Sequence, residues 1–213
     1  EIFISSLDRP NLSYIVRPKR ESFQALLKLL KEHENETAII YCFSRKETET
    51  LAADISGHGF KALPYHAGLD RETRQENQEK FIHDQVPIIV ATIAFGMGID
   101  KADIRLVVHN DLPKSLEGYY QETGRAGRDG LPSEGALFYS YGDKFKQDYF
   151  IDQIENAAEQ ENARLKLAQV IEFCELDTCR RWHLLSYFGE TPEQANCGGC
   201  DVCLTPKEEF DAT

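Results

Sequence analysis

The chain has 213 residues, of which 41% are hydrophobic, so it is long enough to bury the core of one α/β domain with a small appendage. Its formal net charge of -12 argues against a protein that holds nucleic acid through a general positive field. Residues 1–142 contain 17 basic and 21 acidic residues, whereas residues 143–213 contain 7 and 15. Any nucleic-acid contact is therefore expected in a local groove on the first part.

Neither end of the chain carries a membrane or secretion signal. No run of 18 apolar residues occurs, and Glu1-Ile2-Phe3-Ile4 lacks the basic and then apolar pattern of a signal peptide. We therefore expect a soluble, non-secreted protein with no membrane partner. Because the chain lacks an initial Met and ends abruptly, we also expect it to be a piece of a longer protein.

Strands and helices are predicted to alternate along the first 140 residues. The expected elements are a strand at 13–16, a helix at 21–33, a strand at 37–43, a helix through Glu47, Leu51 and Ile55, a strand at 62–65, a helix at 70–83, strands at 87–91 and 104–109, a helix before Gly124, and a strand at 136–140. The strands are apolar throughout, which is typical of a parallel sheet with helices on both faces.

The spacing of the apolar residues changes beyond Asp143. Helices are predicted at 144–156, 161–174 and 178–187, followed by a loop at 189–203, and no strand is needed. We therefore expect an α/β domain over residues 1–142 and a small helical subdomain over residues 143–213.

Polar or glycine-rich stretches follow four of the predicted strands, at residues 44–46, 66–68, 92–101 and 110–114. In parallel sheets, ligands bind beyond the carboxyl ends of the strands. These loops are therefore expected to converge on one edge of the sheet.

Two arginines stand out after the predicted helix. Arg125 and Arg128 are three residues apart and each follows a glycine, within the stretch from Tyr119 to Gly130. Arginine stays protonated, and its planar guanidinium matches phosphate oxygens two at a time. Such a pair suits an anion that gains charge during a reaction, as a γ-phosphoryl group does. A solvated turn is the alternative reading of the same residues.

The cysteines are clustered near the end of the chain. Of six, three form the pattern Cys-x2-Cys-x2-Cys, at 197, 200 and 203, and Cys179 lies 18 residues earlier on a predicted helix. Four thiolates satisfy tetrahedral Zn²⁺ with no open position, so Cys179, Cys197, Cys200 and Cys203 predict a structural zinc site. An iron–sulfur cluster is the rival, although the Cys-x3-Cys-Pro ending is absent. Cys174 and His183 are the other candidates for the fourth ligand.

The two arginines that follow Cys179 have two readings. Arg180 and Arg181 could make a local contact with DNA or could pair with Glu175 and Asp177, and we slightly favour the pairing.

In this order, the motifs resemble the second RecA-like lobe and the zinc-binding subdomain of a RecQ-family DNA helicase, over nearly the whole chain. Residues 39–45 resemble helicase motif IV, 65–69 the element after it, 91–101 motif V, and 112–115 with 118–130 motif VI. DEAD-box RNA helicases usually carry His-Arg where this chain has Gln121-Glu122, so the resemblance favours the branch that unwinds DNA. It also points to the same four cysteines as zinc ligands.

The resemblance implies a role for each motif residue. Arg128 would be the arginine finger that reaches the γ-phosphate of ATP, with Arg125 beside it. Gln121 would link the nucleotide state to the grip on DNA, and Gly98 and Asp100 would lie near the ribose and phosphates. The implied DNA-backbone contacts are Thr92, Ser44, Arg45, His66 and Lys114, and such contacts carry no sequence information.

Three of these assignments have plain structural alternatives. Asp100 could pair with Lys101 or Arg105, His66 could be a satisfied loop histidine, and Thr92 could belong to a turn.

The chain lacks both a Gly-x4-Gly-Lys-Ser/Thr loop and an Asp-Glu magnesium motif. The resemblance therefore implies half of a shared active site, in which ATP and Mg²⁺ are held mainly by the first lobe of the full-length chain. It implies a 3′ to 5′ DNA helicase that acts on single strands and junctions in DNA repair and recombination, in the nucleoid or the nucleus. The competing readings are a non-catalytic nucleic-acid or protein-binding scaffold and an RNA helicase or remodelling translocase.

Overall fold

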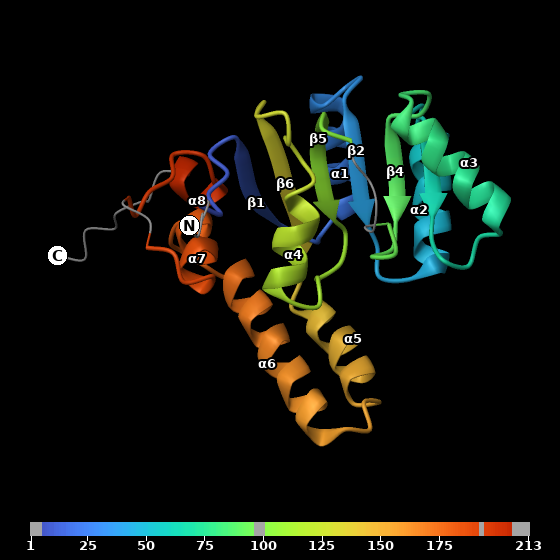
Figure 1. Ribbon diagram of the computed structural model, residues 1–213. Helices are drawn as coiled ribbons and strands as arrows, with labels where there is room; N and C mark the ends of the chain where they lie inside the picture. The colour runs from blue at the N-terminus through green and yellow to red at the C-terminus, as the bar shows by residue number, and fades with distance from the viewer. Residues whose placement is uncertain (1–5, 96–100, 192–193, 206–213) are drawn as a thin grey trace, which may run out of the picture.

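The computed structural model describes residues 6–95, 101–191 and 194–205, and its centre is a six-stranded parallel sheet (Figure 1). The strands are β1 (Leu12–Pro18), β2 (Thr37–Tyr41), β3 (Ala62–Tyr65), β4 (Ile88–Ala91), β5 (Ile104–His109) and β6 (Ser133–Tyr139). Their order across the sheet is β1-β6-β5-β2-β4-β3, and every neighbouring pair is parallel. All strands therefore end at the same edge.

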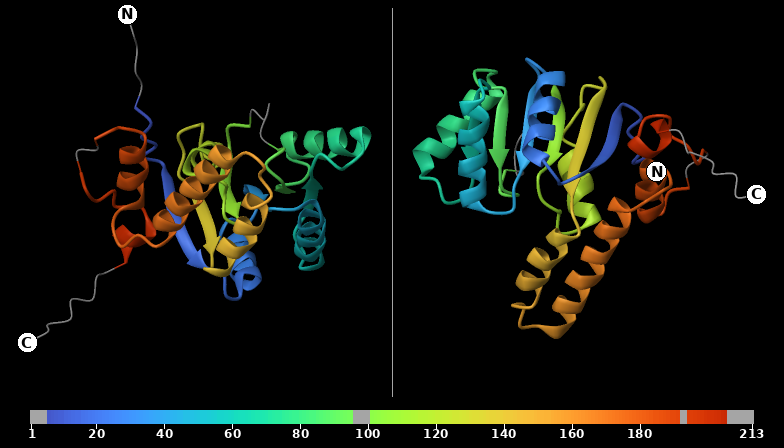
Figure 2. Two further views of the ribbon diagram at one scale, coloured as in Figure 1. Left: turned by 90° about the horizontal axis from the view of Figure 1, so that it is seen from below. Right: turned by 180° about the vertical axis from the view of Figure 1, so that it is seen from behind.

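Helices cover both faces of the sheet, as Figure 2 shows in the view from below. The helices are α1 (Ser22–Glu32), α2 (Arg45–Gly57), α3 (Arg71–Ile82), α4 (Leu116–Thr123), α5 (Gly142–Ile151), α6 (Ala157–Cys174), α7 (Arg180–Tyr187) and α8 (Asp201–Leu204). One apolar core joins α1 and α2 to one face, and a second joins α3, α4, α6 and α7 to the other. The predicted α/β fold is confirmed.

The sequence of each strand fits its place in the sheet. Every residue of β2 and β5 is buried because these strands are covered on both faces. Pro64 cannot donate a ladder hydrogen bond, and its strand, β3, lies at the edge where this loss is tolerated.

Several predicted bounds in the last third were wrong. The expected helix at 144–156 begins at Gly142 and ends at Ile151, and the one expected from 161 begins at Ala157 because the Asn156 side chain caps it. The expected loop at 189–203 contains the first part of a short helix, α8.

The helices α5 and α6 form an antiparallel pair that projects beyond the carboxyl edge of the sheet (Figure 1). At its upper end this pair joins the main core, because Phe173 of α6 packs against Tyr119 of α4 with ring centroids 5.2 Å apart. One apolar cluster thus crosses residue 142, and the division into two domains stays a prediction. Within the described ranges, no helix is long and apolar enough to cross a membrane.

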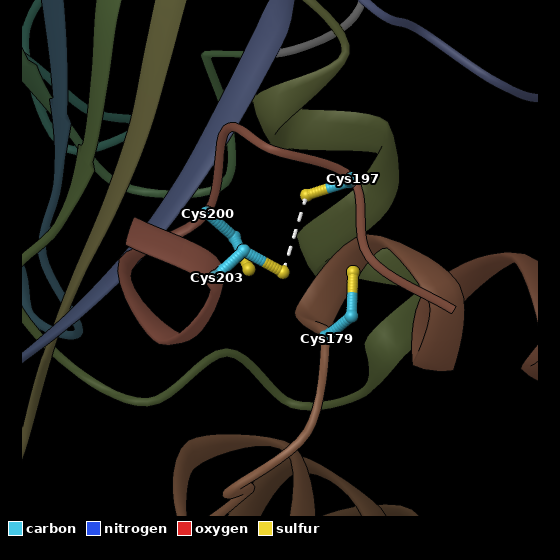
Figure 3. A group of neighbouring side chains, drawn as sticks. All are labelled: Cys179, Cys197, Cys200 and Cys203. Carbon is cyan, nitrogen blue, oxygen red and sulfur yellow. Dashed lines mark hydrogen bonds between the residues drawn. The ribbon is translucent and has the colours of Figure 1, made fainter. Parts of the chain in front are cut away.

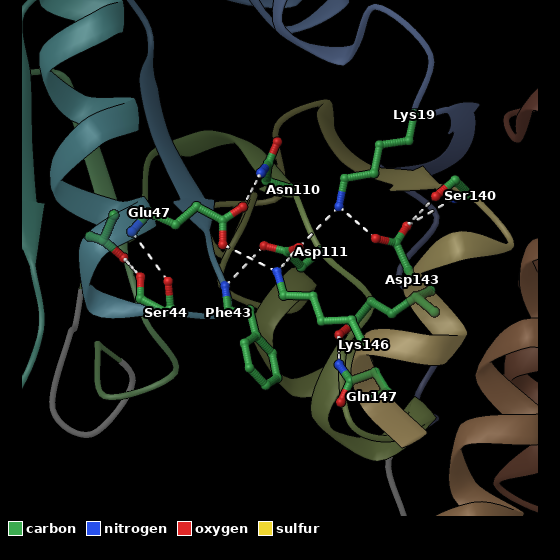
Figure 4. Close-up of polar contacts among 12 residues, drawn as sticks. Lys19, Phe43, Ser44, Glu47, Asn110, Asp111, Ser140, Asp143, Lys146 and Gln147 are labelled. Carbon is green, nitrogen blue, oxygen red and sulfur yellow. Dashed lines mark hydrogen bonds and ion pairs between the residues drawn. The ribbon is translucent and has the colours of Figure 1, made fainter. Parts of the chain in front are cut away.

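A buried ion network fixes α5 to the carboxyl edge of the sheet (Figure 4). Asp111, just after β5, accepts from Lys19 at 3.0 Å and from Lys146 of α5 at 2.8 Å. Its second oxygen accepts from the backbone N–H of Phe43 at 3.0 Å. Lys19 also donates to Asp143 at 2.8 Å. One carboxylate therefore joins the ends of β1, β2 and β5 to the first helix of the predicted subdomain.

The charges in this network decide how Asp111 ionises. Burial opposes the charged carboxylate, but the ammonium groups of Lys19 and Lys146 outweigh it and lower the pKa of Asp111 to about 2. The pKa of Glu47 is raised by burial and by the nearby Asp111 carboxylate. Asp111 therefore keeps its negative charge to a lower pH than Glu47 does.

The lowered pKa of Asp111 predicts how the stability of the fold depends on pH. A carboxyl with a pKa of about 2 in the folded chain and 3.8 unfolded stabilises the fold above pH 4, and this contribution is lost as the pH falls towards 2. Asp111→Asn keeps an acceptor for the Phe43 N–H but removes the charge. We expect it to lower the free energy of unfolding at pH 7 by about 2 kcal/mol. Urea unfolding of the unchanged chain and of the variant at pH 7 and pH 2.5 measures this. The prediction is contradicted if the two chains differ in free energy of unfolding by the same amount at both pH values.

Candidate functional site

The two arginines lie in a turn at the amino edge of the sheet. Helix α4 begins at the Ser115 cap near the carboxyl edge and runs back across one face, so residues 124–130, the arginine turn, reach the opposite edge. There the Gly127 N–H donates to the carbonyl of Ile104 at 2.8 Å, and the Asp129 N–H donates to Ala102 at 3.3 Å. The arginine turn is therefore anchored where β5 begins, not beyond the carboxyl ends of the strands.

Side chains from the start of the chain hold the arginine turn. Arg9 donates to the carbonyls of Ala126 at 2.9 Å and Gly127 at 2.7 Å. Asn11 donates to the same Gly127 carbonyl at 2.8 Å. Gly127 has a φ of 60°, and a Cβ there would lie 2.5 Å from the Asn11 amide nitrogen. Only glycine fits this position, in both backbone conformation and space.

An ion pair braces the end of the turn. The Nη2 atom of Arg105 lies 2.6 Å from each carboxylate oxygen of Asp129. The hydrogen bond from Arg105 holds the pKa of Asp129 below its usual range. Asp129 therefore serves the turn as a structural anion, one residue after Arg128.

The two arginines differ in exposure. Arg125 is only 6% exposed, and its guanidinium lies beside the Tyr41 hydroxyl. Burial raises the pKa of Tyr41 above its usual range, and the cationic neighbour offsets only part of that rise. Arg128 is exposed, as is Gln121, seven residues earlier and on α4. The buried guanidinium is thus fixed in the protein, while the second faces outwards.

Motif V falls partly outside the described residues. Gly98 and Asp100 lie in the undescribed segment 96–100, so their predicted roles stay predictions. The residues that follow, Lys101 and Ala102, lie beside the arginine turn through the Asp129 hydrogen bond. Lys101 and Arg105 are the alternative partners of Asp100; among the described residues, Lys101 pairs with Asp84 and Asp103, at 2.6 and 3.0 Å, and Arg105 pairs with Asp129.

Four other predicted residues meet at the carboxyl edge. Ser44 caps α2 by accepting the Glu47 N–H at 3.2 Å, and Arg45 is exposed in the first turn of that helix. A Cβ on Gly68 would lie 2.9 Å from Arg45 Cδ, so this glycine leaves room for the arginine. Thr92 donates its backbone N–H to Tyr65 at 3.2 Å, at the end of the adjacent strands. Lys114 is exposed after β5.

His66 is buried and internally satisfied. Its Nε2 lies 2.9 Å from a Glu49 carboxylate oxygen, and its Nδ1 accepts the Gly68 N–H at 3.2 Å. With both ring nitrogens engaged, the histidine holds the loop against α2, beside Arg45. The structure thus matches the alternative of a satisfied loop histidine.

The four predicted zinc ligands converge in space (Figure 3). The sulfur atoms of Cys179, Cys197, Cys200 and Cys203 all lie within 4.8 Å of one another. Four Zn–S bonds of about 2.3 Å place tetrahedral sulfurs about 3.8 Å apart, so the cluster fits one Zn²⁺ ion. Backbone N–H groups of Trp182 and Gly199 donate to the Cys179 and Cys197 sulfurs, each at 3.4 Å.

The arginines that follow Cys179 brace this cluster through partners other than those expected. Arg180 donates to both carboxylate oxygens of Asp201, at 2.5 and 2.9 Å, and Asp201 also accepts the Val16 N–H at 3.1 Å. Arg181 donates to the Leu12 carbonyl at 2.7 Å and lies 3.7 Å from Asp8. The predicted pairing with Glu175 and Asp177 was wrong, because the fold places Asp201 and the start of β1 against α7.

Sequence reasoning missed the residues that support the site. Arg9 and Asn11 lie more than 100 positions before the arginine turn, and nothing in their local sequence signals that contact. Asp111 was overlooked for the same reason, although an aspartate directly after a buried strand was a usable signal.

Two family models match the chain. Residues 21–130 match the helicase conserved C-terminal domain, and residues 141–204 match the RecQ zinc-binding family. The first match contains β2 to α4 and the arginine turn, and the second contains all four clustered cysteines.

Curated relatives match along almost the whole chain. The ATP-dependent DNA helicase RecQ of Pasteurella multocida is 44% identical over 211 residues, which is 99% of this chain and 33% of the relative. The ATP-dependent DNA helicase hus2/rqh1 of Schizosaccharomyces pombe is 48% identical over 93% of this chain and 15% of that protein. The chain thus spans a third or less of the length of these relatives.

The sheet is also similar to a solved structure. A DEAD box protein from Methanococcus jannaschii superposes with a TM-score of 0.54 and 28% identity, over 67% of this chain and 39% of that one. The overlap supports a RecA-like sheet. The match to the RecQ zinc-binding family, together with the cysteine cluster, indicates the RecQ type of helicase. The chain therefore belongs to the RecQ-type DNA helicases, as a helicase conserved C-terminal domain followed by a RecQ zinc-binding region.

Proposed function

We propose that this chain is the second half of an ATP-dependent motor that moves 3′ to 5′ along DNA. Arg128 acts as the arginine finger on ATP and Mg²⁺ held mainly by a first lobe, and Arg125 supports it. The observation that carries this proposal is the docked arginine turn, in which Arg9 and Asn11 hold the carbonyl of Gly127 between the buried Arg125 and the exposed Arg128. A solvated turn needs no such anchoring.

The chemistry of this arrangement fits phosphoryl transfer. A preorganised guanidinium stabilises charge as it develops on the transferred phosphoryl group, and this contributes roughly 10³ to 10⁵ in rate in related enzymes. Gln121 is exposed on α4, the helix that leads into the arginine turn, and it is proposed to link the nucleotide state to the grip on DNA. Gly98 and Asp100 are proposed to lie near the ribose and phosphates of the bound ATP.

The single-strand path follows the carboxyl edge of the sheet. Ser44 and Arg45 lie at the amino terminus of α2, and a helix amino terminus attracts phosphate. Thr92 and Lys114 extend the path along the adjacent strand ends, and His66 lies with Arg45 beside Gly68. Backbone contacts of this kind suit a translocase, which must grip any sequence. Such a motor would work in the nucleoid or the nucleus.

The cysteine cluster is proposed to hold Zn²⁺ as a structural ion. All four positions of the tetrahedron are filled by sulfur, so the ion has no open site for a reaction. The Arg180–Asp201 pair ties the bound loop to α7 and β1.

The arginine proposal is tested in the full-length protein. Arg128→Ala is expected to lower kcat for DNA-stimulated ATP hydrolysis by about 10³-fold, while the KM for ATP changes little. Steady-state ATPase assays with saturating single-stranded DNA measure both constants. Arg164→Ala, which removes an exposed pair with Asp152, is the matched control. An unchanged kcat in Arg128→Ala would favour the non-catalytic scaffold.

The isolated 213-residue chain is expected to turn over no ATP, because it has no phosphate-binding Gly-x4-Gly-Lys-Ser/Thr loop. Phosphate release with ATP, Mg²⁺ and single-stranded DNA measures this. Metal-dependent turnover that Arg128→Ala abolishes would refute the division of labour between two lobes.

Removal of the metal is expected to unfold the region around α7 and α8. Cys200→Ser should abolish stoichiometric zinc and lower the thermal midpoint by about 10 °C or more, because metal binding supplies folding free energy. Elemental analysis and calorimetry measure the two effects. Cys42→Ala, which changes a buried cysteine outside the cluster, should retain one zinc per chain. A zinc content unaffected by Cys200→Ser would overturn the assignment.

A further inference from the structure

A buried cluster of Tyr41, His109 and Glu122 lies between the two parts of the proposed site, and no role described above uses it. The His109 Nε2 lies 2.6 Å from a Glu122 carboxylate oxygen, and the side chains are only 2% and 14% exposed. The His109 ring stacks on Tyr41 at 5.2 Å and 27°, and its centroid lies 5.0 Å from that of Tyr119. The histidine is thus held on two sides by rings and at one end by a carboxylate.

Two buried nitrogens in this region have no hydrogen-bond partner within the described ranges. They are the Nδ1 of His109 and the Nε of Arg125. A buried donor or acceptor left without a partner costs about 1–3 kcal/mol. Buried ion pairs are also weak contributors to stability compared with apolar residues of the same volume. Stability alone therefore gives a poor account of a histidine and an arginine at these positions.

The cluster contacts the segment after β4 and the end of α4, which belong to two of the helicase motifs. The Tyr41 hydroxyl donates to the Phe95 carbonyl at 3.0 Å and lies beside the Arg125 guanidinium. Glu122 is in the last turn of α4, three residues before Arg125 and next to Gln121. A displacement of His109 would therefore reach the buried arginine along two routes, through the Tyr41 ring and through the end of α4.

The cluster also reaches the carboxyl edge of the sheet. A cavity of about 120 Å³ has Tyr41, His109 and Glu122 in its lining, together with Phe43, Ile93 and Lys114. Phe43 precedes Ser44 and Ile93 follows Thr92, so three of the proposed DNA contacts lie at or next to residues of this lining. The same small cavity thus borders the proposed DNA path and the support of Arg125.

The geometry points to His109 as a positioning residue that couples the occupied DNA path to Arg125. The His109–Glu122 pair holds the last turn of α4, and the stacked Tyr41 holds the guanidinium. When a strand engages Lys114 and the neighbouring residues, a shift of the cavity lining is passed to the arginine. This inference rests on the proposed function of the arginine turn.

The test uses the full-length protein and compares two substitutions at one position. His109→Phe keeps an aromatic ring but loses the pair with Glu122, whereas His109→Gln keeps a donor near the position of Nε2. We expect His109→Phe to lower the DNA-stimulated kcat about tenfold, with unstimulated kcat, KM for ATP and Kd for single-stranded DNA within about twofold. His109→Gln should recover most of the stimulation.

A second substitution keeps the inference testable if His109→Phe does not fold. Tyr41→Phe preserves the ring and the packing but removes the hydroxyl beside Arg125, and it should lower DNA-stimulated kcat at least threefold, or about 0.7 kcal/mol. His33→Gln is the matched control, because His33 forms a similar pair, with Glu36 at 2.6 Å, outside the cluster of Tyr41, His109 and Glu122. It should leave all four constants unchanged.

The outcomes separate this inference from the proposal on which it rests. Full stimulation in both His109→Phe and Tyr41→Phe, with Arg128→Ala inactive, overturns the coupling role and leaves the arginine finger in place. Equal losses of stimulated and unstimulated kcat in His109→Phe, without recovery in His109→Gln, reduce His109 to a structural role. If Arg128→Ala keeps its kcat, the proposed function itself fails.

Discussion

The hydrogen bonds that Arg9 and Asn11 donate to the arginine turn are the constraint on which the site depends. The carbonyls of Ala126 and Gly127 accept from charged or amide donors rather than from a helix or a strand. Hydrogen bonds from a charged donor to buried carbonyls are stronger than neutral ones. The turn can therefore hold two positive side chains at the edge of a sheet without an extended secondary structure of its own.

These donors come from the segment that leads into β1, and β1 also supports the cysteine cluster. Val16 donates its N–H to Asp201, and Arg181 donates to the Leu12 carbonyl. Edge strand β1 is paired with β6, and the segment that leads into it contacts the arginine turn, while Arg181 of α7 and the short helix α8 contact the strand itself. The zinc region and the proposed catalytic turn thus share one strand as a common support.

The net charge of -12 does not describe how the basic side chains are distributed over the fold. Many basic side chains are neutralised within the fold: Lys19 and Lys146 by Asp111, and Arg105 by Asp129. Arg45, Lys46 and Lys114 are exposed at the carboxyl edge, and Arg128 is exposed on the arginine turn. Exposed positive charge is thus present where an anionic ligand is proposed to bind.

The sequence by itself determined the alternating fold, because uninterrupted apolar runs such as 104–109 demand a sheet covered on both faces. It also determined the cluster of Cys197, Cys200 and Cys203, since that ligand spacing is a local property, whereas the fold brings Cys179, rather than Cys174 or His183, to them. Only the tertiary structure decided that Arg9 holds Gly127, that Arg180 pairs with Asp201, and that His109 lies between the proposed DNA path and Arg125. Those contacts join residues far apart in the chain, and they depend on strand order, which no local pattern encodes.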